Sequence, residues 1–227
     1  MTYLQATLLG ALQGLTEFLP ISSSGHLVLL QHIFGLHEPA LIFDLFVHIA
    51  TLAAVLAMYR QDVYNLFAAW LSPRQGMPGN DSERASARRL GLLLVLANVP
   101  TAVIGLLFES TFEHFFSTPW IVGIALLITG ALLWLLRPSL GHQGGTSEVG
   151  MAHAILLGCI QGLAITPGIS RSGSTIAIAL LCGVSRESAA RFSFLMAIPA
   201  ILGAALLKSE GAFPSFRSGF EQSQVRS

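Results

Sequence analysis

The sequence is poor in charge and in cysteine. Charged residues make up 11% of its 227 positions and hydrophobic residues 53%, whereas soluble globular domains carry about 25% charged residues. Positive and negative residues balance to zero and form no basic stripe, so nucleic acid is not an expected partner. Both cysteines, Cys159 and Cys182, lie in apolar runs, and we interpret them as small core residues. Such a composition predicts a multi-span membrane protein.

Several familiar catalytic motifs are also missing. The chain has no P-loop, no HExxH and no GxSxG sequence, which argues against nucleotide hydrolysis, zinc proteolysis and an α/β-hydrolase triad. Its N-terminus lacks the basic region and the small-residue cleavage site of a signal peptide. We therefore expect the apolar N-terminal segment to be part of the mature protein.

Three apolar stretches approach the roughly 20 residues that a membrane-spanning helix needs. They cover residues 41–59, 90–108 and 120–136, and a fourth, 189–207, has Arg191 near its start. The intervening segments differ in charge: 60–89 is polar and rich in arginine, 109–119 is acidic, and 137–150 begins with Arg137. Because positive loops stay in the cytoplasm, we expect 60–89 and 137–150 inside and 109–119 outside.

Two further apolar segments are interrupted near their centres. Residues 2–35 contain Pro20 and a run of three serines followed by Gly25, and residues 151–183 contain Pro167-Gly168 and Ser170-Arg171-Ser172-Gly173. Backbone that leaves the helix at membrane depth must be buried in protein or line a watery cavity. Each segment is therefore predicted to be a re-entrant hairpin of two helices joined by a polar break.

The two interrupted segments are related by an internal repeat. A shift of 148 positions, without gaps, aligns Leu8-Leu9-Gly10 with Leu156-Leu157-Gly158, Gln13-Gly14-Leu15 with Gln161-Gly162-Leu163, and Ser24-Gly25 with Ser172-Gly173. Counting spans from the inner loops, the first hairpin opens outward and the second inward, so the repeats are inverted. The predicted fold is a single all-α integral membrane domain over residues 1–227, with repeats at about 1–108 and 119–207 and a polar tail at 208–227.

The first hairpin carries a buried acid beside hydroxyl groups and a histidine. Gln13 and Glu17 are four residues apart and share one helix face, and His26 directly follows the serine run. An ionisable group at membrane depth costs about 2.5–3.5 kcal/mol and is by default functional. Histidine there can act as acid, base or nucleophile. The structural alternative is a Glu17 side chain that reaches the membrane interface.

The second hairpin carries one arginine between glycines and hydroxyl groups. The Arg171 guanidinium needs an anionic partner, and its planar fork suits phosphate oxygens. Exposed N–H groups at the start of the following helix would add to an anion site. A structural ion pair between Arg171 and Glu17 is the alternative, and it is compatible with a phosphate site. Asp44 and His48, also four apart, could bind a cation or place a proton, or simply join helices.

These motifs closely resemble those of bacterial undecaprenyl-diphosphate phosphatases, the bacitracin-resistance family. That family shows a Glu/Gln-x-x-x-Glu stretch leading into Pro-x-Ser-Ser-x-Gly-His, and later a Pro-Gly-x-Ser-Arg-Ser-Gly segment. This chain matches the pattern with Gln13 and Glu17, with Pro20 through His26, and with Pro167 through Gly173. The likeness extends over about residues 8–207, and family members usually continue through further helices where this chain has its polar tail. From that difference we expect an incomplete bundle around the second hairpin.

The resemblance implies hydrolysis of undecaprenyl diphosphate to the monophosphate and inorganic phosphate, which recycles the cell-wall carrier lipid at the bacterial inner membrane. It implies that Glu17, Ser23, His26 and Arg171 are catalytic, with either Ser23 or His26 as the nucleophile. Glu17 and Gln13 would hold a divalent cation, Mg²⁺ or Ca²⁺. Lipid phosphates would be bound by the polar groups Gln13, Ser22, Ser24, Gly25, Asp44, His48, Ser170, Ser172, Gly173 and Thr175.

Two other functions share features with this sequence. Inverted repeats with broken helices are also a transporter architecture, so a polyprenyl-phosphate carrier or flippase without catalysis is the alternative. A carrier needs binding groups but no nucleophile, which favours the phosphatase. A type 2 phosphatidic acid phosphatase would need a histidine six residues after Arg171, where this chain has Ala177. The sequence leaves the oligomeric state open, with a homodimer as one option.

Overall fold

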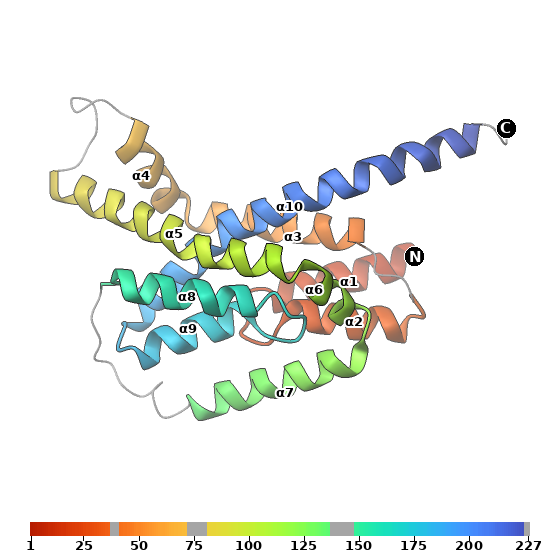
Figure 1. Ribbon diagram of the computed structural model, residues 1–227, viewed down its shortest axis with the longest axis horizontal. Coiled ribbons are helices and arrows are strands. Elements are labelled where there is room, and N and C mark those ends of the chain that lie inside the picture. Colours follow the sequence, from red (N-terminus) through yellow and green to blue (C-terminus); the bar gives the residue numbers. More distant parts are fainter. Residues whose placement is uncertain (37–40, 72–80, 137–147, 225–227) are drawn as a thin grey trace.

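The chain folds into a bundle of helices. The computed structural model describes residues 1–36, 41–71, 81–136 and 148–224, and within these ranges the regular structure is helical throughout (Figure 1). In chain order the helices are α1 (Tyr3–Thr16), α2 (Ser23–Ile33), α3 (Leu41–Met58), α4 (Arg60–Leu71), α5 (Asp81–Leu107), α6 (Glu109–Phe116), α7 (Pro119–Leu135), α8 (Met151–Leu163), α9 (Arg171–Leu181) and α10 (Arg186–Gln224). The all-α prediction is thus confirmed for the described residues.

The predicted breaks in the two interrupted segments are present. We call α1 and α2 the first hairpin, with its break at 17–22, and α8 and α9 the second hairpin, with its break at 164–170. The second helix of each hairpin begins after a serine N-cap. The Ser22 hydroxyl accepts from the Gly25 N–H at the start of α2, and the Ser170 hydroxyl accepts from the Gly173 N–H at the start of α9. Side-chain caps of this kind satisfy N–H groups that the helix itself leaves unpaired.

Among the residues that the structure describes, two helices are long and apolar enough to cross a membrane. Asp81–Leu107 and Arg186–Leu206 reach mean hydropathies of 2.3 and 1.7 over 18 residues, yet only 22% and 33% of those windows are buried inside the protein. Two bent pairs, Phe43–Met58 with Arg60–Leu71 (78°) and Glu109–Phe116 with Pro119–Leu135 (99°), bring the candidate spans up to four. Apolar helices that stay exposed within the fold are those that lipid would cover.

Two segments predicted as connecting loops are largely helical, which corrects the prediction. In 60–89, the described parts form α4 and the first turns of α5; residues 72–80 lie outside the described residues. The α4 helix forms because Val63 and Leu66, three residues apart, pack against the central core. In 109–119, α6 forms around buried Phe112. Helix α10 continues through the tail to Gln224, and the predicted loop at 137–147 lies outside the described residues.

The core forms where α5 and α8 cross in close contact. A side chain on Gly158 of α8 would lie 1.9 Å from the carbonyl oxygen of Ala97 in α5, so only glycine permits this approach. The Thr101 hydroxyl lies at the same crossing, 2.8 Å from the Gly158 carbonyl oxygen. Phe192 and Met196 of α10 complete the core. The predicted burial of the cysteines is wrong, since Cys159 is half-buried and Cys182 is exposed at the end of the second hairpin.

Candidate functional site

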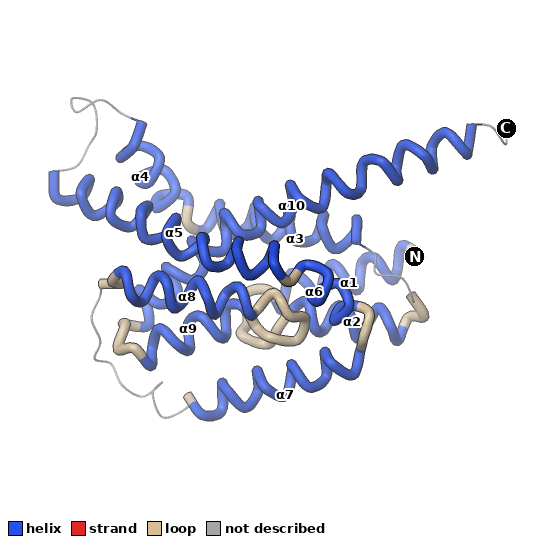
Figure 2. The backbone as a smooth tube through the Cα atoms, viewed as in Figure 1, coloured by secondary structure: helices blue, strands red, loops and turns tan. Residues whose placement is uncertain are grey.

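The breaks of the two hairpins meet in the middle of the bundle. Figure 2 shows their two loops crossing at the centre. The contact is backbone to backbone: a Cβ on Gly25 would lie 2.7 Å from the Cα of Gly168, and one on Gly173 would lie 3.0 Å from the carbonyl oxygen of Pro20. Gly168 itself has a φ of +99°, a conformation that glycine adopts readily. Gly25 and Gly173, predicted as phosphate ligands, therefore also set how closely the hairpins approach.

In each hairpin, the second helix begins with a residue that the sequence predicts to be catalytic. Ser22 and Ser170 are the caps, so Ser23 and Arg171 are the first residues of α2 and α9. Ser23 and Arg171 are also equivalent in the internal repeat, because they are 148 positions apart. Helix N-termini carry partial positive charge and unpaired N–H groups, which favour anions. The repeat thus brings a hydroxyl and a guanidinium to two anion-attracting helix ends.

The carboxylate of Glu17 joins these two residues. Ser23 Oγ donates to Glu17 Oε2 at 2.5 Å, and Arg171 Nη2 donates to Glu17 Oε1 at 2.6 Å. Gln13 Nε2 donates to Glu17 Oε2 at 2.9 Å, as their spacing along α1 predicted. Glu17 is only 8% exposed and the Arg171 side chain 21%. A buried ion pair between the hairpins is therefore present, surrounded by further hydrogen bonds.

Two histidines lie at the edge of this cluster, each bonded to a backbone carbonyl of its own helix or cap. His26 Nδ1 is 2.8 Å from the Ser22 carbonyl, and His48 Nδ1 is 2.6 Å from the Asp44 carbonyl. A carbonyl only accepts, so each Nδ1 carries a proton that it donates, and Nε2 is the ring nitrogen left for other partners. His48 also lies within range of an electrostatic interaction with Glu17. The hydroxyl of Ser23 is bonded to Glu17 rather than to His26.

The remaining predicted residues divide between the cluster and its surroundings. Ser24 Oγ is 3.4 Å from Ser22 Oγ, and Ser172 is buried in the first turn of α9. The Thr175 hydroxyl donates to the Arg171 carbonyl at 2.8 Å. Asp44 lies in the first turn of α3, where its carboxylate accepts from Gln31 Nε2 of α2 at 2.8 Å. Asp44 thus joins α3 to α2.

Sequence reasoning missed the residues that support the second break from other helices. Thr129 of α7 donates to the Gly168 carbonyl at 2.8 Å and accepts from the Ser170 N–H at 3.1 Å. Ser193 of α10 lies 2.5 Å from the Thr175 hydroxyl. The sequence shows each of these residues only as a single hydroxyl group in an apolar segment, and this pattern does not identify the partner of the hydroxyl. Gln161, which the repeat aligns with Gln13, bonds Asn98 and Thr101 of α5.

The oxygen atoms around Glu17 suit a hard divalent cation. Gln13 is fully buried and its Oε1 has no hydrogen-bond partner, although such groups are normally satisfied. Within the described part of the chain, no group of three or more His, Cys, Asp or Glu residues could hold a metal. Mg²⁺ is commonly bound by one or two carboxylates together with substrate phosphates and water, and Glu17 with the Gln13 carbonyl fits that pattern.

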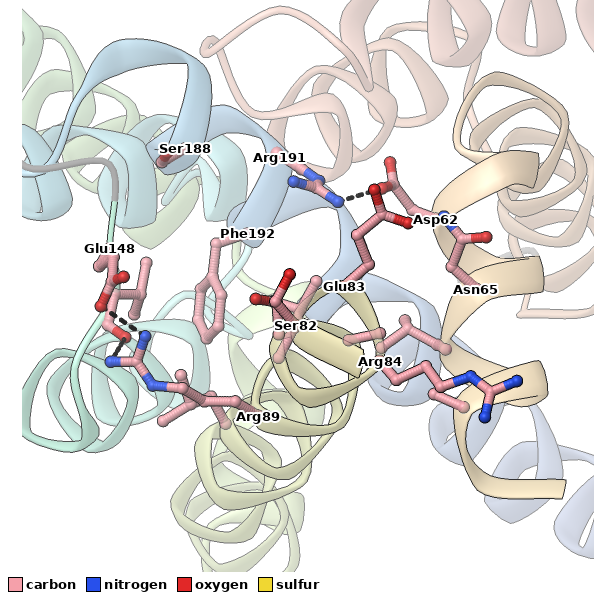
Figure 3. A pocket seen from close by; sticks show the side chains of 17 residues that line it. Asp62, Asn65, Ser82, Glu83, Arg84, Arg89, Glu148, Ser188, Arg191 and Phe192 are labelled. Atoms are coloured by element: carbon pink, nitrogen blue, oxygen red, sulfur yellow. Dashed lines mark hydrogen bonds and ion pairs between the residues drawn. The ribbon is translucent and has the colours of Figure 1, made fainter. Parts of the chain in front are cut away.

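A separate pocket of about 420 Å³ lies between α4, α5 and α10, near residues 148–149 (Figure 3). Arg191 pairs with Asp62 in this pocket, and Arg89 pairs with Glu148 at 2.6 Å. The acidic and basic residues that line the pocket are equal in number: Asp62, Glu83 and Glu148 are acidic, and Arg84, Arg89 and Arg191 are basic. Its lining includes none of the predicted site residues, so the cluster around Glu17 remains the candidate site.

Comparison with known proteins gives consistent matches along the whole chain. The family model described as bacitracin resistance protein BacA matches residues 6–225. An undecaprenyl-diphosphatase of Desulfosudis oleivorans is 47% identical over 94% of this chain and 79% of its own length. Proteins with the same name from Desulforapulum autotrophicum and Alkaliphilus metalliredigens are 44% and 42% identical, covering 97% and 92% of this chain and 82% and 77% of their own lengths.

Proposed function

The chain belongs to the bacitracin resistance protein family, and on this premise we propose that it hydrolyses undecaprenyl diphosphate to undecaprenyl phosphate and inorganic phosphate. It is a multi-pass membrane hydrolase of the kind that recycles the carrier lipid of cell-wall synthesis. The observation that supports this most is the Glu17 carboxylate, bonded at once by Ser23 of one hairpin and Arg171 of the other.

The cluster supplies the groups that phosphoryl transfer requires. We assign the attack on the terminal phosphorus to Ser23 Oγ, whose proton passes to the Glu17 carboxylate that it already contacts. The bond from phosphorus to the bridging oxygen breaks, and undecaprenyl phosphate leaves. Water then attacks the phosphoserine, releasing inorganic phosphate and returning the proton to Ser23 Oγ. Arg171 neutralises the phosphate oxygens, assisted by the N-termini of α2 and α9.

His26 and the cation have supporting roles in this proposal. The Nε2 of His26 is the basic nitrogen that can accept the proton of the attacking water. Glu17 and Gln13 would hold Mg²⁺ or Ca²⁺ together with the lipid phosphates. When bound, the cation neutralises charge on the phosphate oxygens. The other polar groups at the two breaks would bind the diphosphate, with Asp44 and His48 at the periphery.

The arrangement in the membrane is also part of the proposal. We place the chain in the bacterial inner membrane, with its repeats inverted and the first hairpin open to the outside. The sequence repeat and the two matching serine-capped breaks support a duplication, and the arginine-rich segment 60–89 supports its inversion. A homodimer is compatible with the exposed apolar helices. A pure carrier is less well supported, because the bond from Ser23 to Glu17 prepares a nucleophile that binding alone does not need.

The direct test is phosphate release from undecaprenyl diphosphate by the purified chain in detergent. We expect release with Mg²⁺ or Ca²⁺, little release in EDTA, and none from Arg171→Ala. Arg89→Ala, which removes an exposed arginine of the separate pocket, is the matched control and should keep most activity. Metal-independent release would refute the cation assignment. Absence of release from a folded wild-type chain would favour the carrier.

A further inference from the structure

Helix α10 contacts the second hairpin through a buried pair of hydroxyl groups. Ser193 is 4% exposed, and its Oγ lies 2.5 Å from the Oγ1 of fully buried Thr175. Thr175 Oγ1 donates to the Arg171 carbonyl at 2.8 Å. A hydroxyl has a single hydrogen to donate, so Ser193 must be the donor to Thr175. A continuous chain of hydrogen bonds therefore runs from α10 to the backbone of Arg171.

The next residue of α10 contacts the first hairpin. The ring of Phe194 lies 6.2 Å from that of Phe18, the residue that follows Glu17, and 5.9 Å from Tyr59, on which it stacks. Aromatic rings at these separations attract each other beyond simple burial. Consecutive residues of a helix point about 100° apart. One helix can thus touch the flanks of both catalytic groups through neighbouring side chains.

From these contacts we propose that Ser193 and Phe194 are positioning residues that fix Arg171 and Glu17 relative to each other. The inference rests on the proposed function for its catalytic consequence. Each acts on its catalytic group through a neighbour, Ser193 through Thr175 and Phe194 through Phe18. Since a misplacement of about 1 Å can cost on the order of a hundred-fold in rate, a helix that sets this spacing controls turnover.

The test begins with Ser193→Ala, which removes the donor but adds no bulk. We expect kcat for phosphate release to fall about ten-fold, a larger change than that in KM, because the substrate still meets Arg171 in a less fixed position. Ser193→Thr keeps the hydroxyl and should restore most of the rate. Ser188→Ala makes the same change on α10 at the rim of the separate pocket and serves as the control. Equal rates for wild type and Ser193→Ala would overturn the role of Ser193.

A second readout does not depend on catalysis. Amide hydrogen exchange in a peptide covering the first turn of α9 should be faster in Ser193→Ala than in wild type, and unchanged in Ser188→Ala. Unchanged exchange in Ser193→Ala would contradict the positioning contact even if the chain proved not to be a phosphatase. An inactive wild type with the expected exchange pattern would instead refute the proposed function and leave the contact supported.

Phe194 is tested in the same way. Phe194→Leu removes the ring contact with Phe18 and should lower kcat several-fold, whereas Phe194→Tyr keeps the ring and should stay near wild type. Phe115→Leu, which disrupts another ring pair with Phe112 in α6, is the matched control. A Phe194→Leu variant as active as wild type would exclude Phe194 from positioning Glu17.

Discussion

At the residue scale, the chemistry depends on which group attacks phosphorus. Ser23→Ala removes the hydroxyl bonded to Glu17, and we expect phosphate release to fall by at least about a thousand-fold, since the nucleophile is lost. The rate of phosphate release by His26→Gln should fall less, by about a hundred-fold, because only proton transfer is affected. Both rates are measured on purified protein, and Ser117→Ala, an exposed serine after α6, is the control. The reverse order of effects would make His26 the nucleophile.

The pairing of Glu17 with Arg171 could be predicted from sequence because each is an isolated charge in an apolar segment, and burial forces such charges together. The contacts of Thr129 and Ser193 could not. A hydroxyl group in an apolar helix can equally well donate its hydrogen bond to a carbonyl of its own helix, as Thr16 does to the Leu12 carbonyl. Only tertiary packing determines which hydroxyl turns toward a break.

At the scale of the elements, the close crossing of the hairpins should be sensitive to a single methyl group. Gly25→Ala would place a Cβ 2.7 Å from the Gly168 Cα, so the hairpins must separate. We expect a loss of about 1–3 kcal/mol in the free energy of unfolding and a large loss of activity. Gly14→Ala adds a methyl group where nothing lies within 4 Å, and it should not destabilise the protein, because alanine is also favoured over glycine inside a helix. Thermal unfolding in detergent compares the two; equal stability would contradict the crossing.

The hairpins were predictable because proline, serine and glycine mark their breaks, and the serines cap the helices that follow. Helices α4 and α6 were missed for the opposite reason. The polar and charged residues of 60–89 and 109–119 suggested loops, whereas apolar residues of α4 and α6, such as Val63, Leu66 and Phe112, fall on faces that pack against neighbours. Local periodicity was the usable signal, and average polarity concealed it.

At the scale of the whole molecule, inversion of the repeats predicts that the ends of the two hairpins lie on opposite sides of the membrane. Cys182, exposed at the end of the second hairpin, should react with a membrane-impermeant thiol reagent only after permeabilisation of cells. Thr2→Cys, at the exposed start of the first hairpin, should react in intact cells once Cys159 and Cys182 are replaced by alanine. The pattern of labelling is read from the purified protein. Labelling of both positions from one side would show that the repeats are not inverted.

Glu17 is the group that joins the two hairpins into one site. Its most direct test is phosphate release from undecaprenyl diphosphate by Glu17→Gln, compared with Asp62→Asn. Both changes remove a carboxylate that pairs with an arginine, one at the hairpin crossing and one in the separate pocket. We predict a loss of at least about a hundred-fold for Glu17→Gln and a change within a few-fold for Asp62→Asn. A Glu17→Gln variant that keeps wild-type turnover would contradict the account.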